Sequence, residues 1–228
     1  MAKKRNKLYR YTALSSMSSV FQVGNSDPRD LAGNWHNIFG NKNPIVLELA
    51  CGKGDYTLSM AQMFPEKNFI GVDIKGARIF LGAKQAQTLH LPNVRFLRIY
   101  IDHISDYFAP GEVDELWITF PDPHPTDKGA KKRLTHPKFL EKYQNILKPT
   151  GSIRLKTDST LLFDYTLDVL QEFHISPKLV LYNIDKATDI DPQTQSLLTI
   201  ETYYESLHRK NHLAIHFLSF TLQHATIP

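Results

Sequence analysis

The sequence is poor in cysteine. Cys51 is the single cysteine among 228 residues, so no disulfide can form within the chain. No group of cysteines and histidines has the spacing of a structural zinc site. We therefore expect a protein of a reducing compartment, the cytoplasm in particular, with no bound metal.

Long apolar runs are also missing. No stretch approaches the roughly 18 uninterrupted apolar residues that a membrane span needs. The N-terminus is basic like the start of a signal peptide, but no apolar core follows it. The sequence has no internal repeat and no low-complexity tract. These absences predict a protein that does not enter a membrane.

The composition is that of one globular domain. A hydrophobic content of 42% in 228 residues is enough for one full core. We expect that core within residues 41–228, preceded by a basic, loosely ordered arm over residues 1–40 that is rich in Ser, Asn and Gly. The net charge of +4 favours an acidic partner such as nucleic acid, although many enzymes with neutral ligands share it.

From residue 45 onward, short apolar runs alternate with segments of helical spacing. Strands separated by helices indicate a mostly parallel sheet that is covered on both faces. The last two strand-like runs have no clear helix between them, so we expect them to close the sheet as an antiparallel pair. The expected strands are 45–49, 68–73, 94–97, 113–120, 152–157, 179–182 and 213–220, and the expected helices are 56–64, 77–89, 137–147 and 161–173.

Acidic residues stand at the carboxyl ends of the expected strands, where open parallel sheets bind their ligands. These residues are Glu48, Asp73, Asp102, Asp122 and Asp158. A turn with Gly52 and Gly54 follows the first strand, and glycines let the backbone come close to a ligand. Glycines after a strand are by themselves common turn chemistry. Their combination with the carboxylates favours a nucleoside-containing cofactor.

The turn does not fit a dinucleotide well. The pattern G-x-G-x-x-G requires a third glycine where this sequence has Thr57. A carboxylate at Glu48 would repel a pyrophosphate but would attract a cofactor that carries positive charge. Asp73 suits the two ribose hydroxyls of either cofactor type. The pattern therefore favours S-adenosylmethionine, which carries an ammonium and a sulfonium group.

A proline-rich loop follows the strand at 113–120. Prolines on both sides of Asp122 restrict its backbone, and a carboxylate held stiffly beside a cofactor is a candidate catalytic group. Four basic residues follow, at Lys128, Lys131, Lys132 and Arg133. Such a charge run is often only a solvated surface, but its position beside the site favours contact with phosphates.

The sequence resembles the bacterial tRNA (guanine-N7-)-methyltransferase family over about residues 45–220. The Pro-Asp-Pro loop with its basic cluster is more specific than the glycine turn. The matching segments are Leu47-Glu-Leu-Ala-Cys-Gly-Lys-Gly54, Asn68-Phe-Ile-Gly-Val-Asp73, Phe120-Pro-Asp-Pro123, Lys131-Lys-Arg133, Leu147-Lys-Pro-Thr-Gly151, Thr157-Asp158 and Thr202-Tyr-Tyr-Glu205. The resemblance implies a Rossmann-like class I methyltransferase fold and methylation of guanosine N7 in tRNA, in the variable loop, with S-adenosylmethionine.

The resemblance also implies a role for each matching residue. Glu48, Asp73 and Asp102 would contact S-adenosylmethionine, with Gly52 and Gly54 in the cofactor turn. Asp122 would be the catalytic carboxylate. Asp158, Thr202 and Glu205 would engage the guanosine, and Lys128, Lys131, Lys132 and Arg133 would touch tRNA.

The sequence departs from the family pattern at a few positions. Ala50 stands where the family usually has glycine, His124 where it has tryptophan, and Asp73 where glutamate is frequent. Thr126 replaces a substrate-binding lysine, and Lys128 is the candidate to substitute for it.

Other interpretations stay open. Thr202 and Glu205 have the spacing of a helix capping box. His208, His212 and His216 recur every fourth residue, but the strand pattern around them makes a metal site improbable. The chain as a whole would also fit a class I methyltransferase with another acceptor, or a non-catalytic RNA-binding module on the same fold.

Overall fold

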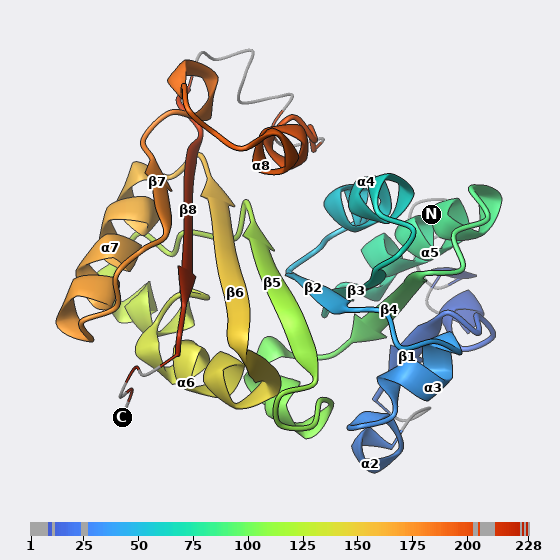
Figure 1. Ribbon diagram of the computed structural model, residues 1–228. Helices are drawn as coiled ribbons and strands as arrows, with labels where there is room; N and C mark the ends of the chain where they lie inside the picture. The colour runs from blue at the N-terminus through green and yellow to red at the C-terminus, as the bar shows by residue number, and fades with distance from the viewer. Residues whose placement is uncertain are drawn as a thin grey trace.

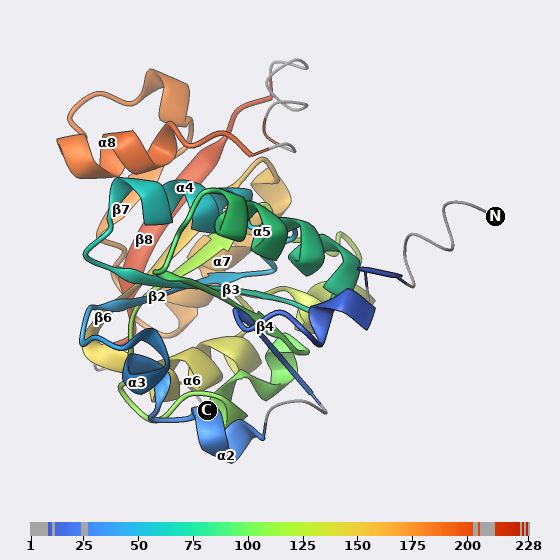
Figure 2. The ribbon, with the colours of Figure 1, turned by 90° about the vertical axis from the view of Figure 1, so that its right-hand side faces the viewer.

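The computed structural model describes residues 9–10, 12–23, 27–202, 205, 213–223, 225 and 227. Within these residues, one sheet of eight strands in the order β1-β4-β3-β2-β5-β6-β8-β7 carries helices on both faces (Figures 1 and 2). The strands are β1 Val20–Gln22, β2 Ile45–Leu49, β3 Asn68–Asp73, β4 Val94–Arg98, β5 Val113–Thr119, β6 Leu147–Thr157, β7 Leu179–Leu181 and β8 His216–Thr221. The helices are α2 Pro28–Leu31, α3 Trp35–Phe39, α4 Asp55–Met63, α5 Gly76–Thr88, α6 Pro137–Ile146, α7 Thr160–Glu172 and α8 Pro192–Leu198, with 3₁₀ helices η1 Ile101–Asp106, η2 Asp127–Lys132 and η3 Ile184–Lys186.

The central strands are buried on both faces, which explains their continuous apolar sequences. In β2, Ile45, Leu47 and Leu49 belong to the hydrophobic cluster under α3, α6 and α7, whereas Val46 belongs to the cluster under α4, α5 and α8. Because side chains alternate along a strand, Glu48 points to the same face as Val46. That face carries α4, α5 and α8 (Figure 2).

The expected fold is confirmed. Strands β1 to β6 pair in parallel, and β8 pairs antiparallel with both β6 and β7. The expected elements between residues 45 and 173 are all present, with ends within a few residues of the predicted ones. The carboxyl ends of β2, β3, β4 and β5 therefore meet at one edge of the sheet.

Residues 12–23 and 27–40 contain more regular structure than the sequence predicts. Strand β1 pairs with β4 and extends the sheet, and Leu14 and Trp35 are fully buried. The Trp35 ring stacks on Phe108 and its indole nitrogen donates to the carbonyl of Tyr107. Single apolar residues between polar ones anchor this stretch to the core. The sequence therefore shows no helical or strand periodicity there from which its structure could be predicted. Residues 1–8, with Lys3, Lys4, Arg5 and Lys7, lie outside the described residues.

Two further differences concern the C-terminal half. A short helix, α8, lies between β7 and β8, where we expected none. It begins at an Asp191 cap whose side chain accepts from the Thr194 amide, and seven residues are too few for a clear helical period. Strand β6 begins at Leu147, before the expected start at residue 152, and residues 148–151 form a bulge within it, because the pairing with β5 jumps from Leu147 to Ser152. In the described part of the chain, no helix has the length and apolarity to cross a membrane.

Candidate active site

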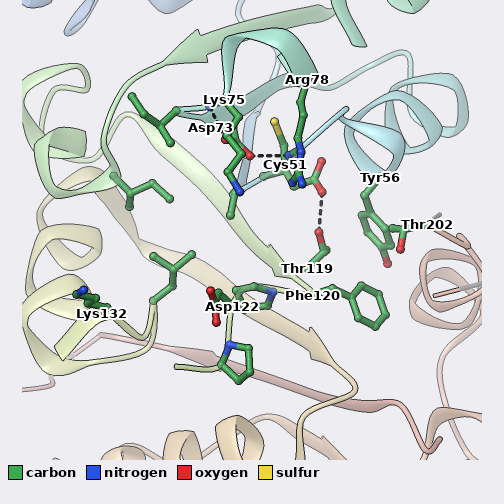
Figure 3. Close-up of a pocket in the computed structure, with 18 of the residues that line it drawn as sticks. Cys51, Tyr56, Asp73, Lys75, Arg78, Thr119, Phe120, Asp122, Lys132 and Thr202 are labelled. Atoms are coloured by element: carbon green, nitrogen blue, oxygen red, sulfur yellow. Dashed lines mark hydrogen bonds between the residues drawn. The ribbon is translucent and has the colours of Figure 1, made fainter. Parts of the chain in front are cut away.

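A cavity of about 1,030 Å³ opens at the carboxyl ends of β2 to β5. Figure 3 shows Asp73, Asp122, Lys132 and Thr202 around it. Of the thirteen site residues predicted from the sequence, eight line this cavity: Glu48, Gly52, Asp73, Asp102, Asp122, Lys132, Asp158 and Thr202. The other five, Gly54, Lys128, Lys131, Arg133 and Glu205, do not. The cavity is at the upper end of the roughly 300–1,000 Å³ that small-molecule sites occupy, which leaves room for two groups side by side.

The glycine turn brings bare backbone to the cavity. Gly52 has a φ of 60°, lines the cavity, and donates its amide to Asp73 Oδ2 at 2.9 Å. An added β-carbon at Gly52 would meet no atom closer than 3.9 Å, so the space beside it is open for a ligand. Ala50 also adopts a left-handed φ, of 56°. The glycine that the family usually has there would remove this strain.

Gly54, the second glycine of the turn, packs closely against β4. It does not line the cavity, and a β-carbon there would lie 2.7 Å from the Phe96 ring. The same ring would collide with β-carbons at Gly71 and Gly82, at 2.9 and 2.8 Å. The absence of a side chain at Gly54 therefore allows α4 and the turn before it to pack against β4. The spacing of the two glycines could not show which of them lines the cavity.

Glu48 is buried beneath the cavity. Its Oε2 accepts the Thr57 amide at 2.8 Å and the Thr57 hydroxyl. Its Oε1 accepts the hydroxyl of Thr119, which is labelled in Figure 3, at 2.6 Å. Burial raises the pKa of the Glu48 carboxyl to about 7, although the hydrogen bonds from Thr119 and Thr57 oppose the shift. A cation in the cavity would favour the ionised form of this carboxyl.

Asp73 and Asp102 stand on neighbouring segments. Asp73 ends β3, and its Oδ1 accepts the Lys75 amide at 2.7 Å, so that its carboxylate is fixed by the two backbone donors Gly52 and Lys75. Asp102 lies in η1 and accepts from Lys138 Nζ of α6 at 2.8 Å. This hydrogen bond lowers the pKa of Asp102 below its ordinary value.

Asp122 stands opposite these residues, in the loop after β5. Its carboxylate is 72% exposed, and its Oδ1 accepts the His124 amide at 3.2 Å. Two residues of this loop, Phe120 and His124, have left-handed φ values of 45° and 43°. Such values are uncommon for residues with side chains, and they collect at functional sites.

The basic cluster divides into two parts. Lys128, Lys131 and Lys132 are exposed, and Lys132 lines the cavity. Arg133 differs from the prediction, because it is only 6% exposed and its guanidinium donates to backbone carbonyls. From the sequence alone, the one arginine that points inward could not be distinguished from the exposed lysines of the same charged run.

Asp158 and Thr202 line the cavity, but Glu205 does not. The Glu205 amide donates to Thr202 Oγ1 at 3.1 Å, which is the first hydrogen bond of a capping box. The Glu205 carboxylate is fully buried and accepts from Lys156 Nζ at 2.7 Å. The Glu205 carboxylate is thus engaged with β6 and does not line the cavity.

Lys156 is a site residue that the sequence interpretation missed. Its ammonium also donates to the carbonyls of Leu198 and Ile200, both at 2.9 Å. Lys156 therefore holds the segment that carries Thr202 against the sheet. Its position one residue before the matched Thr157-Asp158 pair was the only available signal.

Other cavity residues were also missed. Tyr100 lies at the end of β4 and is 64% exposed, and Lys75 and Arg78 lie at the start of α5. Lys138 reaches Asp102 from α6. Of the three histidines that recur at every fourth residue, His208 and His212 lie outside the described residues, and His216 Nε2 is 3.0 Å from the Thr160 hydroxyl.

Known proteins resemble this chain in sequence and in structure. The sequence model of a family described as putative methyltransferase matches residues 42–218. A tRNA (guanine-N(7)-)-methyltransferase of Bacteroides thetaiotaomicron is 42% identical over 226 residues, which are 96% of this chain and 86% of that protein. The structure of the 16S rRNA methyltransferase KamB has a TM-score of 0.62 at 14% identity, covering 83% of this chain and 92% of that one. A SAM dependent methyltransferase from Aquifex aeolicus has a TM-score of 0.52 at 15% identity, covering 85% and 88%.

The two kinds of similarity carry different information. At identities of 14% and 15%, the solved structures show the fold alone, and they confirm the expected class I methyltransferase architecture. Sequence identity over nearly the whole chain confirms the expected enzyme class and its cofactor, S-adenosylmethionine. The chain therefore belongs to the tRNA (guanine-N(7)-)-methyltransferase family.

Proposed function

We propose that this enzyme methylates N7 of a guanosine in the variable loop of tRNA, with Asp122 as its catalytic carboxylate. The observation that carries the proposal is one cavity with acidic groups at the ends of three strands, Glu48, Asp73 and Asp102, on one side and the Pro-Asp-Pro loop on the other. The same proposal places the enzyme in the cytoplasm, with its tRNA substrate.

The cofactor side of the cavity suits a positively charged nucleoside. Gly52 leaves open space beside the backbone, and Glu48, Asp73 and Asp102 contribute carboxylates around it. Asp73 would hold the ribose hydroxyls, and Glu48 and Asp102 would favour the positive charge. S-adenosylmethionine bound in this space supplies a methyl group attached to a sulfonium. A pyrophosphate would face the same carboxylates and would be repelled.

Guanine N7 has an in-plane lone pair and no proton to lose, so Asp122 does not need to act as a general base. Asp122 would accept hydrogen bonds from the N1 and N2 edge of the guanine and stabilise positive charge that develops on the purine. Holding the base in line with the methyl group removes roughly 7–11 kcal/mol of the barrier in well-oriented systems. Positioning is thus the main contribution of the protein.

Asp158 and Thr202 would hold the guanosine at the far side of the cavity from Asp73. Both line the cavity, and Thr202 is kept in place through Glu205 and Lys156. Glu205 would then act on the substrate through Thr202 rather than by direct contact.

The exposed lysines Lys128, Lys131 and Lys132 would contact tRNA phosphates, and Lys128 would take the place of the family lysine that Thr126 replaces. Phosphate contacts release counterions, so tRNA affinity should fall steeply with salt. The target base must leave its stack to enter a cavity, and this is easier in a loop than in a duplex.

The proposal is tested by the Asp122→Asn variant. We expect Asp122→Asn to bind S-adenosylmethionine with unchanged affinity, measured by calorimetry, and to lose most methyl transfer to unmodified tRNA. Asp106→Asn is a matched control, because Asp106 is an exposed carboxylate of η1 outside the cavity. Mass spectrometry of the wild-type product should locate the methyl group on N7 of a variable-loop guanosine.

Three results would contradict parts of the proposal. Full turnover by Asp122→Asn would remove the catalytic assignment. A methyl group at another position, or on a small-molecule acceptor only, would replace the substrate. Failure of the wild-type protein to bind the cofactor at millimolar concentration would favour a non-catalytic RNA-binding role.

A further inference from the structure

Arg133 is the one buried cation of the segment 128–133. It is 6% exposed, whereas Lys128, Lys131 and Lys132 face solvent. Removing a guanidinium from water is unfavourable unless hydrogen bonds or charges replace the lost hydration. The groups that Arg133 contacts therefore indicate its role.

The guanidinium of Arg133 is bound to the loop that carries Asp122. Nε donates toward the carbonyls of Pro123 and His124, at 3.2 and 3.3 Å, and the terminal nitrogen Nη2 donates to His124 at 3.1 Å. On its other side, the guanidinium lies 4.3 Å from the centre of the Tyr165 ring of α7. Arg133 thus connects the two residues that follow Asp122 to a helix of the core.

The loop has few other means of holding its shape. Pro121, Pro123 and Pro125 have no amide hydrogen and cannot donate hydrogen bonds. Phe120 and His124 adopt left-handed φ values, which are unfavourable for residues with side chains and persist only when the surroundings impose them. The Phe120 amide is bound to the carbonyl of Lys156, so the loop is fixed at its start by β6. Arg133 fixes the other end, directly after Asp122.

We propose that Arg133 is a positioning residue for the catalytic carboxylate, and that it does not bind tRNA. This inference rests on the proposed role of Asp122. By holding the Pro123 and His124 carbonyls against Tyr165, Arg133 fixes the direction in which the Asp122 side chain enters the cavity. The basic cluster then has two separate functions, because its exposed lysines meet phosphates and its last member orders the loop.

The test compares Arg133→Met with Lys131→Met. Methionine at position 133 keeps much of the side-chain volume but leaves two carbonyls without their donor. We expect kcat at saturating tRNA and cofactor to fall about 10- to 100-fold, the loss that a displacement near 1 Å can cause. The Kd for S-adenosylmethionine, the Kd for tRNA and the salt dependence of tRNA binding should stay within twofold of wild type, while exchange of the His124 amide hydrogen should become faster.

Lys131→Met should show the opposite pattern. We expect a higher Kd for tRNA and a salt slope that is reduced by about one phosphate contact. Arg133→Lys, which can donate to the carbonyls but has no planar fork, should have a kcat between those of wild type and Arg133→Met.

The inference is overturned if Arg133→Met raises the tRNA Kd and lowers the salt slope but keeps kcat, because Arg133 would then be a phosphate contact. If Arg133→Met no longer binds S-adenosylmethionine, Tyr165→Leu decides the matter: it should lower kcat with both Kd values unchanged, and an unaltered kcat refutes the inference. Asp122→Asn in the same assay separates the two hypotheses. Loss of activity in Asp122→Asn together with full kcat in Arg133→Met contradicts only the inference about Arg133.

Discussion

The ammonium of Lys156 and the carboxylate of Glu205 lie 2.7 Å apart, and neither side chain is exposed to solvent. The two residues come from β6 and from the segment after α8, which are 49 positions apart in the sequence. Their ion pair therefore joins the sheet to the segment that presents Thr202 to the cavity.

Replacing Lys156 should be strongly destabilising. Lys156→Met leaves the Glu205 carboxylate buried without its counter-ion, and breaking such pairs costs about 3–5 kcal/mol. Chemical denaturation of the variant measures this loss. Arg29→Met is the control, because Arg29 pairs with Asp27 at the surface and its removal should change stability little. Equal stabilities of Lys156→Met and Arg29→Met would contradict the prediction.

The stability of the protein should depend on pH through Glu48. Burial raises the pKa of Glu48 from 4.5 to about 7 in the folded protein, so the folded state keeps a proton that the unfolded chain releases. This contribution is fully present below pH 4.5 and is lost as the pH rises through about 7. We expect it to lower the free energy of unfolding by about 2 kcal/mol between about pH 5 and about pH 8.

Glu48→Gln isolates this effect, because glutamine does not titrate. The free energy of unfolding is measured by denaturation for the wild type and the variant across that pH range. As the pH rises, the value for the wild type should fall relative to the value for the variant. Parallel curves would show that Glu48 has the same pKa in both states.

Ala50 should be a site where glycine stabilises the fold. The left-handed φ of 56° costs an alanine roughly 1 kcal/mol relative to glycine. We therefore expect Ala50→Gly to raise the melting temperature. Ala86→Gly is the control, because Ala86 lies within α5, where glycine costs roughly 0.5–1 kcal/mol. A decrease in both variants would mean that the conformation of Ala50 is not strained.

The fold could be predicted from the sequence where apolar runs were long and regular. Strands β2, β3 and β5 are buried on both faces, and continuous apolar residues indicate such strands directly. Strand β1 has three residues, and its place beside β4 depends on pairing across more than seventy positions. Such distant pairing leaves no local pattern in the sequence, and β1 could not be predicted for this reason.

The site could be predicted where topology alone sets position. Glu48, Asp73 and Asp122 lie at or just after the carboxyl ends of parallel strands, so they had to meet at the same edge of the sheet. The direction of a single side chain is a different matter. Arg133 and Glu205 turn inward because of partners in other segments, His124 and Lys156, and no spacing within the sequence encodes those partners.

The packing of Phe96 has a consequence for how this part of the fold can change. The ring occupies the volume that side chains at three glycines would need. A smaller residue at position 96 would not free all three, because a β-carbon at Gly82 would still meet the Lys53 carbonyl at 2.1 Å and Gly54 would keep its left-handed φ. Gly71 has neither obstacle: its φ is not left-handed, and besides the Phe96 ring the nearest atom to a β-carbon there would be the side-chain sulfur of Cys51, at 3.0 Å. Residues 71 and 96 should therefore vary together among relatives. Where alanine replaces Gly71, a residue smaller than phenylalanine should stand at position 96.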